Sequence, residues 1–442
     1  MQLTSPITLK KVFSDKAFLV ILLLGFLLRF MWCTYFPTYP ETDFMWYHVK
    51  GAEIAQGQGF LNGTYPDYAG ITGEPTAFRP IGYPATLAAI YYFTGQSIYA
   101  GKMLNVFLSV LSIMLLYIIC RRFFSRKFSL VCASLLSFSP LAIIYTGILG
   151  SETLFMTLLL FCAYFMLVSR RPIVTGVLIG YLALVRPIGM YFLACLVLFI
   201  FLDKNLDWKR KLRQSLAIVI FAFLIITPWL VRNYHAFGTP VYSTNGGYVL
   251  YVNNNPYATG TWSNPLEYPD SPFKKHYHED WFDELSMHNE GKSLATQWIQ
   301  QNPASFIRLS FKRLANTYWT KLDDIMWGFT TGVDNWHPYY TRAILLQNIL
   351  FKPFNIVLWF GMLVLFIKVI KDVFKKKKYR SNSPNLLFMF ILIMFVYFNS
   401  MIFVLEGNSR YVVPLFPFYS MVVVYVLSKF EFKRFWKKVI SE

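Results

Sequence analysis

The chain has 442 residues, of which 55% are hydrophobic and only 15% are charged. Ordinary soluble domains carry roughly 25% charged residues, and a soluble core could not bury so much apolar surface, which argues against a cytosolic enzyme. The net charge of +19, from 42 Lys and Arg against 23 Asp and Glu, would suggest nucleic acid in a soluble protein. Here the basic residues cluster at the ends of apolar runs, which indicates membrane topology instead.

A series of apolar runs predicts an all-α polytopic membrane protein with about ten transmembrane helices, since a span takes about 20 mostly apolar residues. Two longer outer segments between the runs are expected to carry short amphipathic helices. The fifth and sixth runs are shorter than the others. The runs cover 17–36, 97–119, 128–147, 152–169, 172–186, 188–202, 214–230, 353–371, 384–404 and 411–428.

Basic segments between the runs fall on alternate sides of the spans and so share one side, which the positive-inside rule makes the cytoplasm. Most acidic residues and all six histidines then lie outside. This distribution fits a membrane-embedded enzyme or a receptor better than a pore. We expect an N-terminal transmembrane module at 1–230 that includes a first outer loop at 37–96. An outer loop region follows at 231–352, and a C-terminal transmembrane module at 353–442.

Three short elements are predicted in the outer segments. Residues 45–56 predict a helix on the membrane surface, with Trp46 and Tyr47 among its apolar contacts. Residues 303–320 have helical apolar periodicity with basic residues between, which suits an interfacial helix facing anionic headgroups. Residues 249–252 form a strand-like piece between turns.

Two carboxylates at the outer ends of spans are candidate catalytic groups. Asp43 follows the first span, and an acid at the membrane surface can act as a general base if burial and neighbours tune it. The alternative is a helix N-cap, with Thr42 or Asp43 opening the helix. Glu152 begins the fourth span, where it either helps to form an outer site or is a charge favoured by the helix dipole.

Four arginines on the outer side are candidates for binding an anion, and Arg186, which lies deep in apolar sequence, needs an anion or a carbonyl partner. Arg79, which precedes a proline, either binds a phosphate in bidentate fashion or contacts a headgroup from a turn. Arg186 lies between two short runs, and Arg410 precedes the last span. Arg232 ends the seventh span, where a proline-broken helix end with an aromatic belt is the alternative.

Segments rich in Asn and Gly at 243–248 and 253–260 indicate tight turns, and they also offer hydrogen bonds to hydroxyl groups, as sugar sites do. The residues 276–279 (His-Tyr-His-Glu) have metal-ligand types, but a lone His-x-His in an acidic loop is usually solvated. The sequence has no P-loop and no Asp-x-Asp pair, so a cytosolic nucleotide-sugar site is unsupported. We expect no required cofactor, and a divalent metal stays open.

In their order along the chain, these pieces resemble the membrane glycosyltransferases of the GT-C superfamily. The most similar branch holds the protein O-mannosyltransferases and the aminoarabinose transferase that modifies lipid A. Aminoarabinose transferases often carry Asp-Glu-x-Arg-Tyr, whereas Phe44 and Trp46 stand here between Asp43 and Tyr47. The matching pieces are Asp43 with Tyr47, Arg79-Pro80-x-Gly82-Tyr83-Pro84, Glu152, Arg186-Pro187, Pro228-Trp229-x-x-Arg232-Asn233-Tyr234, Thr244-Asn245-Gly246-Gly247, Asn254-Asn255-Pro256-x-Ala258-Thr259-Gly260 and Arg410-Tyr411-x-x-Pro414.

The resemblance implies a sugar donor on a polyprenyl phosphate and inverting transfer at the outer face, with Asp43 as the catalytic base and Arg79 at the lipid phosphate. We add Glu152 to the catalytic group, and Arg186, Arg232 and Arg410 to the phosphate site, because fixed cations stabilise the charge that develops on the leaving group. The expected substrate pocket contains Tyr47, Tyr83, Asn245, Asn254, Asn255 and Tyr411.

The sequence therefore predicts a hexosyl or pentosyl transferase in a bacterial or archaeal plasma membrane, with a lipid, glycan or protein acceptor and no nucleic acid. The alternative is a lipid-linked glycan flippase, which needs a polar path through the membrane. Arg29 and the borderline Arg186 are the charged members expected in the spans, so such a path is not evident.

Overall fold

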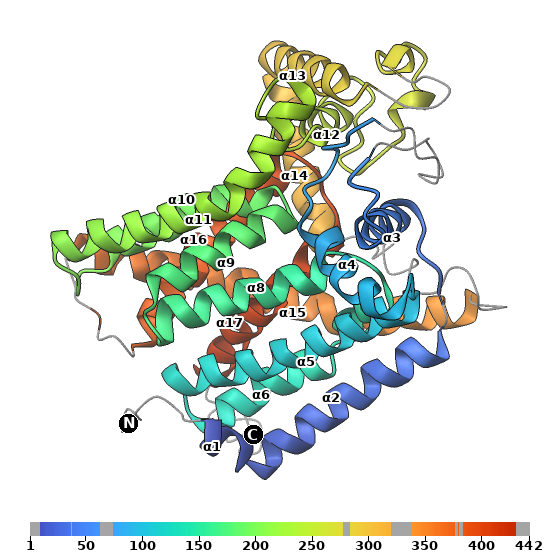
Figure 1. Cartoon of the computed structure of the whole chain (residues 1–442). Helices are drawn as coiled ribbons and strands as arrows, with labels where there is room; N and C mark the ends of the chain where they lie inside the picture. The colour runs from blue at the N-terminus through green and yellow to red at the C-terminus, as the bar shows by residue number, and fades with distance from the viewer. Residues whose placement is uncertain are drawn as a thin grey trace.

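The computed structural model describes residues 9–36, 38–61, 74–276, 283–319, 337–375, 379 and 383–429, and these residues are mainly helical (Figure 1). Within them, β structure is limited to an isolated bridge between Leu61 and Pro75. The principal helices are α1 (Leu9–Phe13), α2 (Lys16–Tyr35), α3 (Thr42–Ala55), α4 (Gly82–Thr94), α5 (Ile98–Phe123), α6 (Arg126–Ser137), α7 (Pro140–Ile144), α8 (Glu152–Ala163), α9 (Pro172–Val185), α10 (Ile188–Leu202), α11 (Trp208–Phe237), α12 (Asn245–Asn253), α13 (Glu284–Gln301), α14 (Pro303–Tyr318), α15 (His337–Phe374), α16 (Pro384–Val404) and α17 (Phe416–Lys429). Short helices of other types are η1 (Tyr145–Gly147), η2 (Tyr164–Val168), η3 (Pro265–Glu267), η4 (Lys274–His276) and η6 (Ser409–Leu415).

Within the described ranges, six helices are long and apolar enough to cross a bilayer. They are α2, α5, α11, most of α15, α16, and η6 joined to α17. The pair α6 and α7–η1 gives a seventh candidate, bent by 55°. The apolar helices α8–η2, α9 and α10 are shorter. These helices coincide with the predicted runs, but the total of ten crossings stays a prediction.

Arg29, buried in α2, explains how the bend between α6 and α7 is tolerated. The helix α6 ends at Ser137 and α7 starts at Pro140, so the last carbonyls of α6 lack helical partners. The Arg29 guanidinium donates to the carbonyls of Leu136 and Ser137 at 2.9 Å, and its Nε donates to Ser109 Oγ at 2.7 Å. This cation therefore satisfies a broken helix and has a structural role.

A further cation, Lys102, lies in α5, so the expectation that Arg29 and Arg186 are the charged members of the spans was wrong. Its side chain is buried, and Lys102 Nζ donates to Thr38 Oγ1 at 3.1 Å. Thr38 in turn donates to the carbonyl of Gly147. The contacts tie the segment after α2 to α5 and η1, as expected for a buried cation that must find polar partners.

The helices α3, α12, α13 and α14 gather in the upper right of Figure 1, beyond one end of the spans. The helix α3 confirms the helix predicted over 45–56, and its place on the membrane surface stays a prediction. Trp46 and Tyr47, expected among its membrane contacts, pack inside the protein instead. Trp46 is only 2% exposed, and its ring contacts that of Phe60. Tyr47 is 7% exposed and contacts the Tyr83 ring of α4.

The strand predicted over residues 249–252 is instead part of the helix α12. Tertiary packing overrides the β propensity of its valines. A side chain on Gly247 would meet the His288 carbonyl oxygen at 1.8 Å, and one on Gly291 would meet the Gly247 oxygen at 2.6 Å. The two glycines thus let α12 and α13 approach closely enough for a short helix to be stabilised by its neighbour.

The helix α14 matches the predicted interfacial helix, but its basic residues divide between two environments. Arg308 and Lys312 are exposed. Arg313 is fully buried and donates to the carbonyls of Asn253 and Phe403. The prediction that all of these cations face headgroups is therefore wrong for Arg313, which fastens α14 to α12 and α16.

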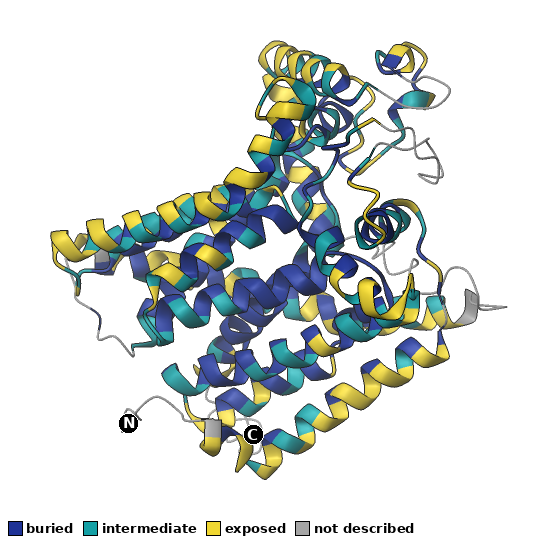
Figure 2. Cartoon of the chain, in the orientation of Figure 1, coloured by how far each residue is buried: buried dark blue, intermediate teal, exposed yellow. Residues whose placement is uncertain are grey.

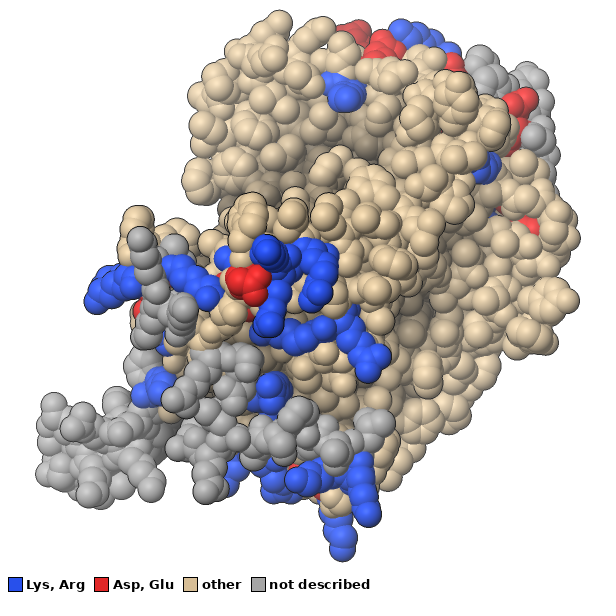
Figure 3. All heavy atoms as spheres, turned by 60° about the vertical axis from the view of Figure 1, so that its left-hand side comes forward, with Lys and Arg blue, Asp and Glu red and all other residues tan. Residues whose placement is uncertain are grey.

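Burial is uneven among the spans (Figure 2). In the apolar windows of α5 and α16, 67% of residues are buried, against 22% in α2 and 28% in α11. The exposed apolar flanks of α2 and α11 suit contact with lipid tails. Figure 3 shows Lys and Arg grouped on the side that lies to the left in Figure 1, where α10 joins α11. This grouping fits the predicted cytoplasmic side, which stays a prediction.

Candidate active site

Asp43 lies in the first turn of α3. The N-cap position of this helix belongs to Glu41 and no side chain caps it, so the N-cap alternative for Thr42 and Asp43 was wrong. Thr42 has a φ of 50°, a left-handed backbone that β-branched residues rarely adopt. Such a conformation costs about 1–3 kcal/mol and persists only where surrounding structure imposes it. The Asp43 carboxylate is not engaged in capping and pairs with arginines instead.

Two arginines from distant segments hold the Asp43 carboxylate. Arg79 Nη2 lies 2.5 Å from Asp43 Oδ1, and Arg410 Nη1 lies 3.3 Å from Asp43 Oδ2. Burial alone would raise the pKa of Asp43, but the positive charges of Arg79 and Arg410 outweigh it and lower this pKa. Asp43 is therefore ionised at neutral pH, the state in which a carboxylate accepts a proton.

A second ion pair lies beside the first. Glu152 opens α8, and Arg186 follows α9, where Pro187 prevents the helix from continuing. Glu152 Oε1 lies 2.7 Å from Arg186 Nη1, and the two side chains are 3% and 14% exposed. The guanidinium carbons of Arg186 and Arg410 both lie over the Tyr411 ring, at 5.5 Å and 5.6 Å from its centroid. The two pairs therefore form one cluster around Tyr411.

Gly82 lets the Arg79 loop approach Arg186. A Cβ atom on Gly82 would lie 2.5 Å from the carbonyl carbon of Leu184 and 2.6 Å from the nitrogen of Val185. The start of α4 thus packs directly on the backbone at the end of α9. Tyr181 Oη donates to the Gly82 carbonyl at 2.9 Å and fixes this crossing. Because Arg79 is three residues before Gly82 and Arg186 directly follows Val185, this contact brings the two cations to the same cavity.

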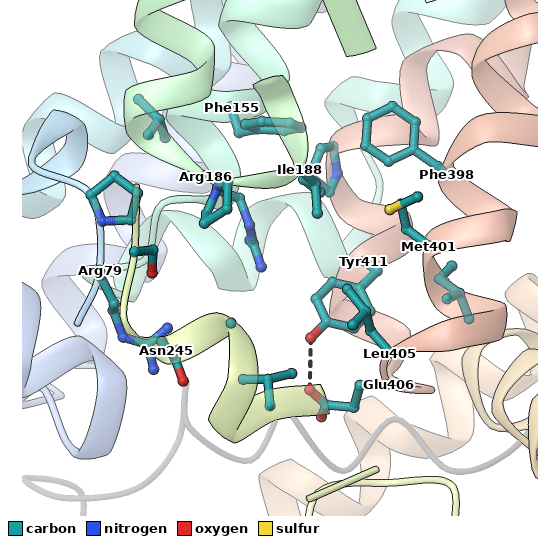
Figure 4. Close-up of a pocket in the computed structure, with 18 of the residues that line it drawn as sticks. Arg79, Phe155, Arg186, Ile188, Asn245, Phe398, Met401, Leu405, Glu406 and Tyr411 are labelled. Carbon is teal, nitrogen blue, oxygen red and sulfur yellow. Dashed lines mark hydrogen bonds between the residues drawn. The ribbon is translucent and has the colours of Figure 1, made fainter. Parts of the chain in front are cut away.

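A cavity of about 180 Å³ lies against this cluster (Figure 4). Its polar residues include Arg79, Arg186, Asn245, Glu406 and Tyr411. Its apolar wall comes from the apolar helices α8, α10 and α16 and the residue after α16, with Phe155, Ile188, Phe398, Met401, Ile402 and Leu405. In Figure 4 the arginines and Asn245 lie on one side, and Phe398 and Met401 on the other. The cavity is therefore amphipathic, with fixed cations at one end and apolar spans at the other.

The structure brings together eight of the predicted site residues. Asp43, Glu152 and Arg410 join the ion-pair cluster, and Arg79, Arg186, Tyr47, Asn245 and Tyr411 line the cavity. Tyr83 is fully buried behind Tyr47, with the ring centroids 5.1 Å apart.

The other three predicted residues lie elsewhere. Arg232 donates to the carbonyls of Phe60 and Thr76 at 2.6 Å. Asn254 accepts from Arg313, and the Asn255 side chain bonds to the backbone of α12 and the following turn.

Glu406 is a cavity residue that the sequence analysis did not select. Its Oε2 accepts a hydrogen bond from Tyr411 Oη at 2.8 Å, and the residue is 6% exposed. The sequence carried a signal for it, because Glu406 is an acidic residue beside an apolar run, at a predicted outer end, as Glu152 is. Ser243, which also lines the cavity, had no such signal apart from its place before an Asn- and Gly-rich turn.

The metal-like segment at 276–279 is only partly described, since His278 and Glu279 lie outside the described residues. His276 Nε2 lies 2.6 Å from Glu290 Oε2, and Lys275 pairs with the other oxygen of that carboxylate. Among the described residues, no group of three His, Cys, Asp or Glu side chains could hold a metal ion. Independence from metal nevertheless stays a prediction.

Comparisons with known proteins indicate which family and which solved structures this chain resembles. Residues 78–231 match the model of the dolichyl-phosphate-mannose-protein mannosyltransferase family. None of the curated proteins with which the sequence was compared matches it.

Solved structures share the fold. ArnT from Cupriavidus metallidurans in the apo state has 12% identity and a TM-score of 0.54, over 98% of this chain and 63% of that one. The same protein bound to undecaprenyl phosphate has 12% identity and a TM-score of 0.53, over 97% and 63%. The Archaeoglobus fulgidus oligosaccharyltransferase tethered with an acceptor peptide has 13% identity and a TM-score of 0.51, over 94% and 50%.

The chain thus spans between 50% and 63% of the length of these structures. The apolar helices and the shared fold support an integral membrane protein. The resemblance predicted from the sequence is confirmed as a resemblance, because residues 78–231 match a mannosyltransferase family model and the ArnT and oligosaccharyltransferase structures share the fold.

Proposed function

We propose that the chain transfers a sugar from a polyprenyl-phosphate donor to a cell-envelope acceptor at the outer face of the membrane, with inversion and with Asp43 as general base. The observation that carries this proposal is the amphipathic cavity beside the Asp43 cluster. A lipid phosphate is amphipathic in the same way, with an anion at one end and an apolar tail at the other. The ArnT structure bound to undecaprenyl phosphate supports this class of donor.

The reaction would be a single displacement. The acceptor hydroxyl oxygen bonds to the anomeric carbon, the bond from that carbon to the phosphate oxygen breaks, and the hydroxyl proton passes to Asp43. A carboxylate must lie within about 3 Å of the hydroxyl to take this proton. The electron pair leaves with the polyprenyl phosphate, whose growing charge is stabilised by Arg79, Arg186 and Arg410. Attack opposite the leaving group inverts the anomeric centre.

Donor binding would rearrange the ion pairs that the arginines form with Asp43 and Glu152 in the absence of donor. Asp43 and Glu152 together offset two of the three positive charges, and an incoming phosphate would share Arg79 and Arg410 with Asp43. Sharing weakens the hold of the arginines on Asp43 and makes it a stronger base. Glu152 would orient Arg186 toward the phosphate, and Tyr411 would fix the planes of Arg186 and Arg410.

Asn245 and Glu406 are well placed to meet the hydroxyl groups of the sugar, because both line the polar part of the cavity. Arg232, Asn254 and Asn255 are left out of this proposal, since their side chains bond to backbone or to Arg313. No cofactor is required in this scheme. The acceptor is proposed by class alone, as a lipid, glycan or protein of the cell envelope.

The test is sugar transfer by the purified full-length protein in lipid nanodiscs. A panel of radiolabelled undecaprenyl-phosphate sugars is supplied with membrane extract, and label is followed from donor to acceptor. We expect one donor class to transfer its sugar and Asp43→Asn to be inactive with it. Passage of an uncleaved lipid-linked glycan across a proteoliposome membrane, without sugar transfer, would instead establish the flippase alternative. The comparisons do not favour that alternative.

A further inference from the structure

Glu284, the first residue of α13, is a buried carboxylate outside the cavity. It is 2% exposed. Its Oε2 accepts hydrogen bonds from the backbone N–H of Ala77 at 2.9 Å and from Thr244 Oγ1 at 2.7 Å, and its Oε1 accepts one from Thr76 Oγ1. A carboxylate is kept in so enclosed a place only when its oxygens are satisfied in this way.

The partners of Glu284 lie within three residues, along the chain, of two residues of the cavity. Thr76 and Ala77 precede Arg79, and Thr244 precedes Asn245. The two segments are also bonded to each other, since Thr244 N–H donates to the Ala77 carbonyl at 2.9 Å. Their neighbours in the sequence are bonded too, since Ser243 Oγ donates to the Phe78 carbonyl at 2.8 Å. Glu284 therefore closes a ring of contacts that sets how the Arg79 and Asn245 segments lie relative to each other.

The helix that carries Glu284 is itself held firmly. The close approach of Gly247 and Gly291 fixes the separation of α12 from α13. The N–H of Gly247 also donates to His288 Nδ1 at 3.0 Å. His288 lies one turn after Glu284, so α13 contacts the Asn245 segment from two successive helical turns.

Arg232 partly compensates the negative charge of Glu284. Burial raises the pKa of Glu284, while the bonds from Thr76, Ala77 and Thr244 and the charge of Arg232 oppose this rise. Arg232 also donates to the Thr76 carbonyl, next to the Glu284 bonds. The arginine at the end of α11 thus supports the same short segment that Glu284 holds.

We propose that Glu284 is a positioning residue for the donor phosphate site, fixing the Arg79 and Asn245 segments without touching the donor. This inference rests on the proposed function, since it assumes that Arg79 meets the lipid phosphate. Loss of Glu284 would let the Arg79 segment shift, and the affinity for the phosphate would fall. Chemistry on a bound donor would suffer less, because Asp43 is carried by α3 and is held from its other side by Arg410.

The test uses purified full-length protein and undecaprenyl phosphate as the probe, with polyprenol, which lacks the phosphate, as the control ligand. The variants are Glu284→Ala, Glu284→Gln and Thr244→Val. Glu290→Gln is the matched control, because it neutralises another α13 carboxylate that pairs with Lys275 and His276 away from the cavity. Thermal unfolding identifies variants that fold, and donor KM and kcat are measured in the transfer assay.

We expect Glu284→Ala to weaken undecaprenyl phosphate binding about tenfold or more and to raise donor KM more than it lowers kcat. Glu284→Gln should recover part of the affinity, because its amide oxygen can still accept from Ala77 and Thr244. Thr244→Val removes a single hydroxyl and should cause a smaller loss, which keeps the test open if Glu284→Ala does not fold. Glu290→Gln should bind as the wild type does.

A double-mutant cycle separates positioning from general stability. If Glu284 acts through Arg79, then Glu284→Gln should weaken binding in the wild type but add little loss in an Arg79→Ala background. Fully additive losses would overturn the proposal, as would wild-type affinity in both folded Glu284→Gln and Thr244→Val. Wild-type protein that binds polyprenol as well as undecaprenyl phosphate would overturn the proposed donor as well, which distinguishes the two failures.

Discussion

Asp43 and Arg410 are separated by 367 positions in the chain, yet Arg410 Nη1 lies 3.3 Å from the Asp43 carboxylate. Asp43 belongs to α3, near the start of the chain, and Arg410 to η6, which opens the last candidate span. The cluster is therefore complete only when the C-terminal helices pack against the N-terminal ones. This arrangement lets several substitutions be predicted from named contacts.

Asp43→Asn should abolish sugar transfer while leaving the protein folded. Removal of a general base lowers the rate by about 10²–10⁴-fold. Affinity for undecaprenyl phosphate should be kept or increased, because Arg79 and Arg410 lose a competing anion. The measurements are single-turnover transfer and lipid binding. Asp207→Asn is the matched control, since Asp207 is an exposed N-cap of α11 and Asn caps equally well. Turnover at the wild-type rate by Asp43→Asn would remove Asp43 from the mechanism.

Arg79→Ala should weaken donor binding more than Arg308→Ala. Arg79 lies at the cavity, whereas Arg308 is exposed on α14. Loss of a charge-assisted contact to phosphate is worth about 1.5–3 kcal/mol, or roughly one to two orders of magnitude in affinity. Arg79→Lys should be intermediate, because an ammonium group cannot reproduce the bidentate contact. Donor affinity is measured at fixed ionic strength, and equal values for the two alanine variants would require the phosphate site to be sought around Arg186 and Arg410.

The acid limb of the pH–rate profile should reflect the lowered pKa of Asp43. A folded-state pKa below the ordinary value means that Asp43 stays ionised as pH falls, so kcat/KM should hold until below about pH 4. The stability that its ion pairs contribute is present above the unfolded pKa and is lost as pH falls through the folded pKa.

Bound donor phosphate competes for Arg79 and Arg410, so the acid limb of kcat should lie at a higher pH than that of kcat/KM. The check is a pair of pH profiles for the same donor. A kcat/KM limb near pH 6–7, within the ordinary histidine range, would point to a different base.

Gly82→Ala should destabilise the protein and weaken donor binding together. The added methyl would meet the backbone of Leu184 and Val185 at 2.5 Å and 2.6 Å, so α4 must move away from α9. Overpacking of this kind costs about 1–3 kcal/mol, and it displaces Arg79 from Arg186. Thermal unfolding and lipid binding measure the two effects. Thr94→Ala, at the exposed end of the same helix, is the control. A Gly82→Ala protein with unchanged affinity would show that this crossing does not set the cation spacing.

The spans were predictable because apolar runs of bilayer length leave few alternatives. The candidate site was predictable in part, for a related reason. An arginine in apolar surroundings must find an anion or a carbonyl, and Arg79, Arg186 and Arg410 all pair with carboxylates. Arg232 gives the same signal in the sequence but finds the carbonyls of Phe60 and Thr76. Local sequence does not distinguish these two outcomes.

Glu284 and the helix α12 were missed because their partners are far away in the chain. Glu284 is one of many acidic residues in the predicted outer loop region, and its bond to Thr76 crosses 208 positions. The helix α12 was missed because its stability comes from contact with α13 through Gly247 and Gly291. In both cases the deciding interactions are tertiary, and neither periodicity nor residue type reveals them. The three-module division and the roles of the site residues stay predictions.

The contacts of Arg29 constrain the order in which the helices can enter the membrane. A lone arginine at the centre of a bilayer span is unfavourable by about 2.5–3.5 kcal/mol on insertion scales. Its partners outside α2, Ser109 and the carbonyls of Leu136 and Ser137, are synthesised about 80 to 108 residues later. During that interval the cation has only the Gly25 carbonyl of its own helix, so α2 must wait at the protein-conducting channel or let the side chain reach the interface. The first span thus becomes fully membrane-compatible only when α5 and α6 arrive, which makes α2, α5 and α6 a single unit of insertion.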